Sequence, residues 1–267
     1  MYALPKASGG VRPIACGSVL RRLAAGGVAR AYREELGTAA GPHQFAVGRP
    51  GGAGIMQKAI AVAAEHRSSA VVIKYDFRNA YNSLTRKAAR EGLAQGARAV
   101  LASHAVALPD VAPTLASGVT THWWVDAVGE ASPVKERGVD QGCPLSPALF
   151  ALAVAPALAR VASALRQLDA EALVFAYLDD VSIAAEESDI AACILCWRAA
   201  LEEFGLVENA SKTCLWTASG SPPADPVAAA CWHQACYRVA FYLRGRRVGC
   251  ARGEFELSLI HISEPTR

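Results

Sequence analysis

The chain has 267 residues, of which 52% are hydrophobic and 19% are charged. That composition can bury a large core and predicts a globular protein of one large domain or two modest subdomains, which excludes an extended, disordered chain. With 27 Lys and Arg against 24 Asp and Glu, the net charge of +3 permits nucleic-acid binding without arguing for it, so any basic surface must be local.

The eight cysteines show no framework spacing and no secretory leader begins the chain, so we expect a reducing, intracellular setting, with nucleus and cytoplasm not distinguished. Cys193–Cys196 and Cys231–Cys236 could be drawn together as a zinc site. The second spacing matches no zinc module, however, and a CxxC pair in a helical pattern is typical of core-facing or partly buried thiols. The longest charge-free apolar segment, residues 143–159, is interrupted by prolines and predicts a core helix, not a membrane span.

In chain order, the first fifty residues predict a loop-rich, locally basic region with one helix over 18–36. A helix over 53–66 and a β-branched strand over 70–77 follow. The further expected elements are a helix over 84–102, a strand over 120–128, a helix over 146–165 with a kink at Pro156, strands over 173–177 and 181–185, a helix over 188–204 and a hairpin over 237–248. Strands that alternate with helices without a regular βαβ rhythm predict an α+β fold, with helices packed on one face of the sheet.

Two adjacent carboxylates, Asp179 and Asp180, stand inside the apolar run 175–185. Isolated buried carboxylates cost several kcal/mol unless they are paired or bind a cation. Because side chains alternate along a strand, both can point one way only if the chain turns at the pair. Asp76 lies at the exit of the strand over 70–77. If that strand lay alongside, three carboxylates would converge, and they would ionise together only around Mg²⁺ or Mn²⁺.

Two such ions can activate an attacking hydroxyl and stabilise the leaving oxygen of a phosphoryl displacement, which is the chemistry of polymerases and nucleases. Aspartate is also common in exposed hairpin turns. The pair by itself therefore leaves a metal site and a simple turn both open.

The surrounding segments resemble, in order, the reverse transcriptase family, in the branch that includes non-LTR retrotransposons and group II introns. The resemblance covers about residues 5–249. It rests on Lys6 with Val11–Ile14, on His43–Gly51, on Lys74–Tyr81, on Gly138–Pro147, on Tyr177–Asp180, on Phe204–Thr213 and on Phe241–Gly245. Asn82 stands where many relatives have a second acidic residue, and Leu178 stands where alanine is usual.

The resemblance implies the palm and partial fingers of a right-hand polymerase, with an antiparallel palm sheet. The thumb is lacking or truncated, so the chain resembles a fragment of a longer protein. The expected parts are partial fingers over 1–68, palm over 69–105, a fingers and nucleotide-pocket segment over 106–146, palm with the hairpin and a primer-grip-like hairpin over 147–250, and a non-native or disordered tail over 251–267.

The resemblance also implies a role for each matching residue. Asp76, Asp179 and Asp180 would be catalytic and would hold two Mg²⁺ or Mn²⁺ ions, with the Phe77 carbonyl nearby. Arg12 and Lys6 would grip the triphosphate, since a guanidinium matches phosphate oxygens bidentately. The aromatic ring of Tyr81 would lie under the sugar and exclude a 2′-hydroxyl. Gln141 and Gly142 would face the nucleotide and template, and Lys212 would protonate the departing pyrophosphate.

The implied function is RNA-directed DNA polymerase of a retroelement, which transfers nucleotides from dNTP to a DNA primer on an RNA template, with no membrane partner and no indication of oligomeric state. Three alternatives remain open. The chain could be an inactive remnant that only binds nucleic acid, a two-metal nuclease, or an RNA-templated RNA polymerase, which Tyr81 disfavours.

Overall fold

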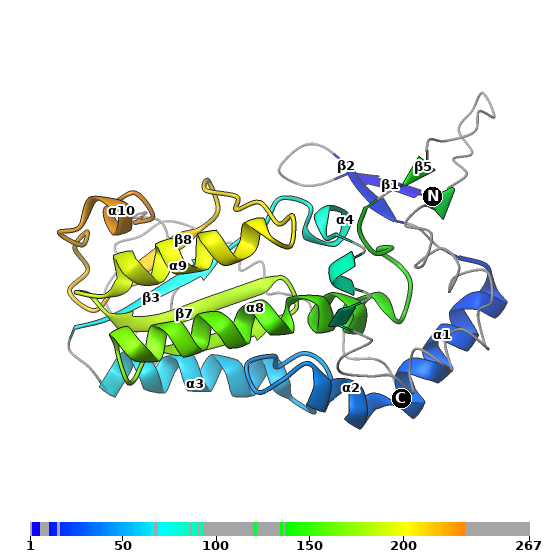
Figure 1. Ribbon diagram of the computed structural model, residues 1–267, viewed down its shortest axis with the longest axis horizontal. Coiled ribbons are helices and arrows are strands. Elements are labelled where there is room, and N and C mark those ends of the chain that lie inside the picture. Colours follow the sequence, from blue (N-terminus) through cyan, green and yellow to red (C-terminus); the bar gives the residue numbers. More distant parts are fainter. Residues whose placement is uncertain are drawn as a thin grey trace, which may run out of the picture.

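The computed structural model describes residues 2–5, 11–14, 17–66, 69–85, 87–89, 91–92, 120–121, 134–135 and 137–232 (Figure 1). Its elements in chain order are β1 (Tyr2–Pro5), β2 (Val11–Ile14), α1 (Val19–Ala31), α2 (Arg33–Ala39), α3 (Gly52–His66), β3 (Ala70–Tyr75), α4 (Ala80–Ser83), β4 (Thr120–Thr121), β5 (Val134–Lys135), α8 (Ser146–Leu168), β6 (Leu173–Tyr177), β7 (Asp180–Glu186), α9 (Ile190–Glu202), β8 (Cys214–Thr217) and α10 (Pro226–Ala229).

The centre of the fold is a four-stranded sheet in the order β6-β7-β3-β8, with every neighbouring pair antiparallel. The β-branched residues of β3 favour a strand that is buried on both faces. In its pairing with β7, Ala70 faces Glu186 and Tyr75 faces Val181. This register brings the exit of β3 beside the turn between β6 and β7, so two segments that are far apart in the sequence share one end of the sheet.

The two faces of the sheet pack against different helices. Val71, Ile73 and Tyr75 belong to the large core cluster that includes the buried residues of α8 and α9, and Figure 1 shows these two helices side by side along the sheet. Residues on the opposite face of β3, β6 and β7 form a second, smaller cluster with α3. Its members are Val72, Phe175, Ala184, Met56, Ile60 and Ala64. The predicted α+β fold with an antiparallel sheet is confirmed. The expectation of helices on one face holds for α8 and α9 but omits α3.

Helix α8 is long and apolar enough to cross a membrane by length and composition alone, but 67% of its apolar window is buried inside the fold. It packs against α9 and β6, and Pro156 lies in its interior. Burial on this scale is typical of the core helix that the sequence predicts for this region.

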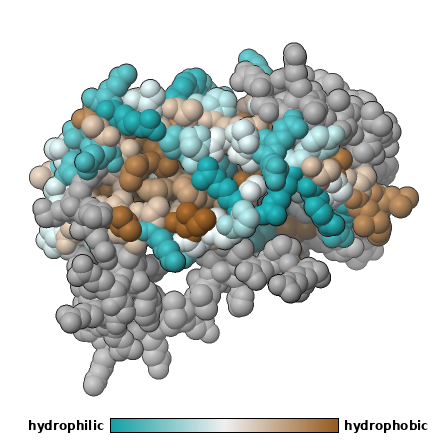
Figure 2. Space-filling model, turned by 90° about the horizontal axis from the view of Figure 1, so that it is seen from below, coloured by the Kyte–Doolittle hydropathy of each residue, from teal (hydrophilic) through white to brown (hydrophobic). Residues whose placement is uncertain are grey.

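The helix expected over 18–36 is divided at Tyr32, where the backbone turns to φ −106° and ψ 24° between α1 and α2. Ser18 caps α1, since its side chain accepts a hydrogen bond from the Arg21 amide at 3.3 Å. Figure 2 shows apolar surface at the end of the molecule that α1 forms. The exposed apolar residues of α1 are Val19, Leu20 and Leu23.

Several predictions fall outside the described residues. They are the primer-grip-like hairpin over 237–248, the tail over 251–267, and most of the helix expected over 84–102 and of the strand expected over 120–128. The boundaries of the palm and fingers parts therefore stay predictions.

Candidate active site

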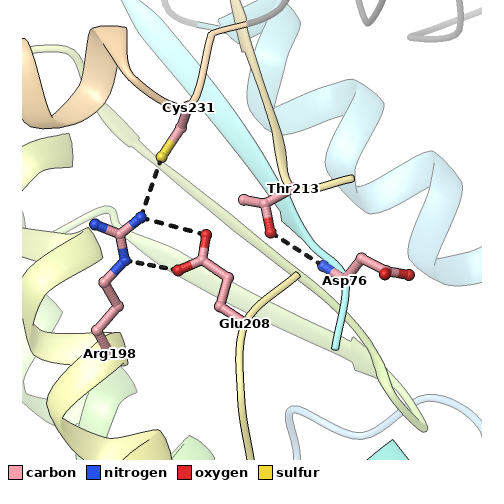
Figure 3. Close-up of polar contacts among 5 residues, drawn as sticks. All are labelled: Asp76, Arg198, Glu208, Thr213 and Cys231. Atoms are coloured by element: carbon pink, nitrogen blue, oxygen red, sulfur yellow. Dashed lines mark hydrogen bonds and ion pairs between the residues drawn. The ribbon is translucent and has the colours of Figure 1, made fainter. Parts of the chain in front are cut away.

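Asp76 follows β3 directly and is held from the segment that precedes β8. The Asn209 side-chain amide donates a hydrogen bond to Asp76 Oδ2 at 2.7 Å, and the Asn209 backbone amide donates to the Asp76 carbonyl at 2.8 Å. The Asp76 amide in turn donates to Thr213 Oγ1 at 3.4 Å (Figure 3). Because one carboxylate oxygen and both backbone groups have partners, the orientation of Asp76 is fixed by neutral donors and acceptors.

The segment that holds Asp76 is itself anchored to α9. Arg198 donates to both carboxylate oxygens of Glu208, at 2.6 Å from Nε and 3.3 Å from one terminal nitrogen. Arg198 also donates to the Cys231 sulfur at 3.5 Å (Figure 3). The Glu208 side chain is only 12% exposed, and a bidentate pair is the geometry that compensates a carboxylate for the loss of water. This anchor places Asn209 beside Asp76.

The other two carboxylates come from the hairpin between β6 and β7. Tyr177 pairs with Asp180, so the two loop residues are Leu178 and Asp179, and Asp180 is already the first residue of β7. The turn thus lies one residue earlier than the Asp179–Asp180 pair, at which the sequence predicts it. Leu178 adopts φ +55°, a left-handed conformation that hairpins usually assign to glycine and that is strained for leucine.

Gln44 supports this strained turn from another part of the chain. Its side-chain oxygen accepts hydrogen bonds from the Leu178 amide at 2.9 Å and from the Ala46 amide at 3.2 Å. The backbone on either side of Gln44 bonds to Ala176 in β6. Gln44 is fully buried, so the loop after α2 and the hairpin turn form one packed unit.

The charged groups around the turn affect the ionisation of Asp179. Burial raises the pKa of the Asp179 carboxyl above its ordinary value, and a hydrogen bond from its own backbone amide lowers it in part. The negative charges of Asp180 and Asp76 raise the pKa further, while Arg12 lowers it. Asp180 also forms an ion pair with Lys74, with 3.2 Å between Nζ and Oδ1. Three carboxylates from two strands and two cations therefore share one end of the sheet.

The donor chemistry here fits a hard divalent cation, because carboxylate oxygens are the ligands that Mg²⁺ and Mn²⁺ prefer and because mutual repulsion disfavours ionisation of Asp179. The arrangement fits less well. Within the described ranges, no group of three or more His, Cys, Asp or Glu side chains is gathered closely enough to hold a metal ion. Asp76 is hydrogen-bonded to Asn209, and Asp180 is turned to Lys74.

A cavity of about 220 Å³ lies next to this end of the sheet. It combines a cation from β2, a ring from α4 and the backbone and side chains of the loop before α8. Its lining residues are Arg12, Ile14, Tyr81, Asp140, Gln141, Gly142, Cys143, Ser146 and Pro147. Four of the residues predicted to bind a nucleotide thus surround one cavity.

The wall of the cavity depends on a close approach between two backbones. The Val139 amide donates to the Tyr81 carbonyl and the Gly138 amide donates to the Leu84 carbonyl, both at 2.7 Å. Gly138 has φ +78°, and a Cβ there would lie 2.4 Å from the Tyr81 carbonyl oxygen. Only glycine satisfies both demands. The Tyr81 ring is fixed from its other side by Phe150, with centroids 5.0 Å apart and planes at 17°.

The remaining predicted residues lie elsewhere. Lys6 is outside the described residues. Lys212 is exposed in the turn after Asn209 and does not line the cavity. The side chain of Phe77 points into the core, where its ring lies 6.3 Å from that of Trp197. The bonds on either side of Phe77 join the Asp76 carbonyl and the Arg78 amide to the segment 207–209.

Among the described cysteines, Cys143, Cys193, Cys196 and Cys231 are free thiols. Cys193 and Cys196 lie on α9, one buried and one partly buried. Burial raises the pKa of the Cys193 thiol to about 12, so in the absence of a metal ion this thiol is protonated at neutral pH. Cys236, the last residue of the second spacing, lies outside the described part of the chain.

Sequence reasoning did not single out Gln44, Asn209 or Lys74 as members of the site. Each lies inside a segment that resembles the family, and each is a polar residue beside an apolar strand or turn. That position was the available signal, but nothing local in the sequence says which group of the site each one contacts.

Comparison with known proteins identifies the family of the chain. The family model "Reverse transcriptase (RNA-dependent DNA polymerase)" matches residues 4–235. A retrotransposable element SLACS 132 kDa protein from Trypanosoma brucei gambiense is 30% identical over 219 residues, which are 80% of this chain and 17% of that protein. The chain therefore spans only a small part of this relative.

Solved structures show the same fold at low identity. The telomerase of Candida tropicalis, in complex with a TWJ fragment of telomeric RNA, superposes with a TM-score of 0.57 at 13% identity and covers 81% of this chain and 40% of that one. The telomerase of Candida albicans, also with a TWJ fragment, gives a TM-score of 0.52 at 15% identity and covers 71% and 34%. With the family match over most of its length, the chain belongs to the reverse transcriptase family.

Proposed function

We propose that this chain is the polymerase domain of a retroelement protein and that it copies RNA into DNA. The observation that carries the proposal is that the cavity and the cluster of carboxylates lie next to each other. The cavity lined by Arg12, Tyr81 and Gln141 lies within electrostatic reach of Asp179, whose carboxyl responds to Arg12 as well as to Asp76. A nucleotide in the cavity would have its phosphates beside the carboxylates.

In the proposed reaction the primer 3′-hydroxyl attacks the α-phosphorus of a dNTP. The 3′-hydroxyl releases its proton to water, a bond forms between the 3′-oxygen and the α-phosphorus, and the bond from the α-phosphorus to the oxygen that bridges to the β-phosphate breaks. Pyrophosphate leaves, and the primer is longer by one nucleotide. Two Mg²⁺ or Mn²⁺ ions, held by Asp76 and Asp179 with Asp180 and the Phe77 carbonyl, would supply charge neutralisation at the attacking and leaving oxygens.

The residues of the chain would position the nucleotide. Arg12 would bind the triphosphate oxygens, because a guanidinium presents paired donors to phosphate, with Lys6 as a second cation. The ring of Tyr81, fixed against Phe150, would exclude a 2′-hydroxyl and so select dNTP. Gln141 and Gly142 would contact the base and the template. Lys212 would protonate the pyrophosphate if its exposed side chain reached the site.

Primer extension tests the proposal. The purified chain, with Mg²⁺ or Mn²⁺, should extend a DNA primer on an RNA template. Asp179→Asn should lower the rate at least 100-fold, because it removes a charged ligand of the metal ions that stabilise the reacting oxygens. Glu202→Gln, which neutralises an exposed carboxylate on α9, should leave the rate unchanged. No extension at any metal concentration, or an equal rate for Asp179→Asn, would refute polymerase activity for this chain.

Substrate choice gives an independent readout. Tyr81→Val should increase ribonucleotide incorporation relative to deoxynucleotide at least tenfold, whereas Tyr81→Phe should keep the native preference because the ring remains. Salt-sensitive nucleic-acid binding without incorporation would instead favour a binding remnant, and cleavage of nucleic acid without added nucleotides would favour a nuclease.

A further inference from the structure

Lys74 breaks the pattern of β3. The other residues of this strand are buried, but Lys74 is exposed. It lies opposite Ser182 of β7 and two positions before Asp76, so these residues share the face of the sheet that carries the carboxylates. Its Nζ lies 3.2 Å from Asp180 Oδ1, and the two side chains are 45% and 39% exposed. A charged side chain therefore occupies the position next to the proposed metal ligands.

The three carboxylates have different neighbours that stabilise their negative charge. Asp76 receives hydrogen bonds from a neutral amide, that of Asn209. Asp179 feels the attraction of Arg12, which the repulsion of its two acidic neighbours opposes. Asp180 alone of the three has an ion pair with a lysine in the described part of the chain. Among the described residues the three carboxylates do not form a group that could hold a metal ion, and Asp180 is turned to Lys74.

We propose that Lys74 competes with the divalent cation for the Asp180 carboxylate and thereby weakens metal binding to the free protein. The inference rests on the proposed function, because it requires the carboxylates to bind the ion. The ammonium group neutralises Asp180 when no metal is present and repels an incoming cation. Full occupancy then needs either a high metal concentration or the added negative charge of a nucleotide triphosphate in the adjoining cavity.

A structural role for Lys74 makes the opposite prediction. If the ion pair served only to join β3 to β7, its loss would loosen the hairpin and metal binding would weaken. If Lys74 competes with the metal, its loss releases Asp180 and binding tightens. The sign of the change in metal affinity therefore separates the two roles, without any need for catalysis.

Mn²⁺ binding to the full chain, followed by the electron paramagnetic resonance signal of the free ion at low salt, provides the measurement. Lys74→Met should tighten Mn²⁺ binding about three- to tenfold, a modest change because both partners are partly exposed. Lys87→Met is the matched control. It removes the same charge from an exposed pair with Glu91 at 3.9 Å, and it should leave the affinity unchanged. Equal or weaker binding by Lys74→Met would overturn the proposal.

Two further variants make the result specific. In an Asp180→Asn background, Lys74→Met should bring much less than the full gain, since the carboxylate that is competed for is gone. Lys74→Gln, which keeps a polar side chain, replaces Lys74→Met if thermal melting shows that the methionine variant is unfolded. A full gain in the Asp180→Asn background would contradict competition through Asp180.

The failure of the inference can be distinguished from the failure of the proposed site. If Asp179→Asn weakens Mn²⁺ binding but Lys74→Met does not tighten it, the metal site stands and the role of Lys74 is wrong. If Asp179→Asn and Asp76→Asn both bind Mn²⁺ as the native chain does, the proposed metal site is wrong, and the inference falls with it.

Discussion

The two faces of the sheet at the exit of β3 differ although they are built from neighbouring residues. On one face, the rings of Tyr75 and Phe77 lie 5.7 and 6.3 Å from the ring of Trp197 on α9. On the other face, Asp76 is bonded to Asn209 and Lys74 is paired with Asp180. At this end of the sheet, the face with Tyr75 and Phe77, here called the apolar face, stabilises the fold, because burial of rings is favourable. The face with Lys74 and Asp76, here called the polar face, carries the proposed chemistry, and the like charges gathered there are unfavourable for folding.

The largest effect should follow a change on the apolar face. Trp197 is 1% exposed, so Trp197→Ala should lower the free energy of unfolding by about 3–5 kcal/mol, measured by urea denaturation. Trp197→Phe should cost clearly less, because the ring contacts are largely kept and the indole N–H has no hydrogen-bond partner in the described structure. An alanine variant as stable as the native chain would break the comparison.

A smaller loss should follow from Gly138, where backbone contact and not a side chain shapes the site. Gly138→Ala combines a left-handed φ of +78° with a Cβ at 2.4 Å from the Tyr81 carbonyl oxygen. It should cost about 2–3 kcal/mol of stability and weaken dNTP binding through displacement of Tyr81. Gly54→Ala is the control, since nothing lies within 4 Å of its Cβ and it is helical. Equal melting temperatures for the two variants would exclude the close approach.

On the polar face, removal of a supporting group should affect metal binding more than stability. Asn209→Ala takes away the amide that orients the Asp76 carboxylate at 2.7 Å and should weaken Mn²⁺ binding about 10- to 100-fold. Ser211→Ala, which removes an exposed hydroxyl that bonds to the Asn209 side-chain oxygen, should have a much smaller effect. Native Mn²⁺ affinity in Asn209→Ala would show that Asp76 needs no support.

The smallest expected effect is a gain in stability, on replacement of Asp179. Because burial and the neighbouring carboxylates raise the pKa of Asp179 in the folded chain, the unfolded chain releases this proton at lower pH, and stability falls as the pH rises through the folded pKa. In metal-free buffer, Asp179→Asn should therefore raise the melting temperature by a few degrees at pH 7. The gain should vanish below about pH 3.9, where both states are protonated. A loss of stability at pH 7 would contradict the comparison.

Local sequence patterns were sufficient for several elements. The β-branched run before Asp76 predicted β3, and the apolar run that holds the Asp pair predicted the two strands of the hairpin. They were less reliable at breaks, since nothing in the apolar pattern over 18–36 marked Tyr32, where the helix is divided between α1 and α2. The turn was placed one residue late, because pairing of Tyr177 with Asp180 depends on the register of the whole hairpin.

The sequence by itself determined the family and the residue types at the site. Its carboxylates, arginine, tyrosine and glutamine stand in segments that resemble the family's motifs and follow one another in the family's order. Only the tertiary structure decided which of them share one place, since β3 and β7 pair although they lie far apart in the sequence. It also decided that Asn209 supports Asp76, that Gln44 holds the strained turn at Leu178 and that Lys74 faces Asp180. Such contacts depend on strand register and side-chain direction, which no local pattern specifies.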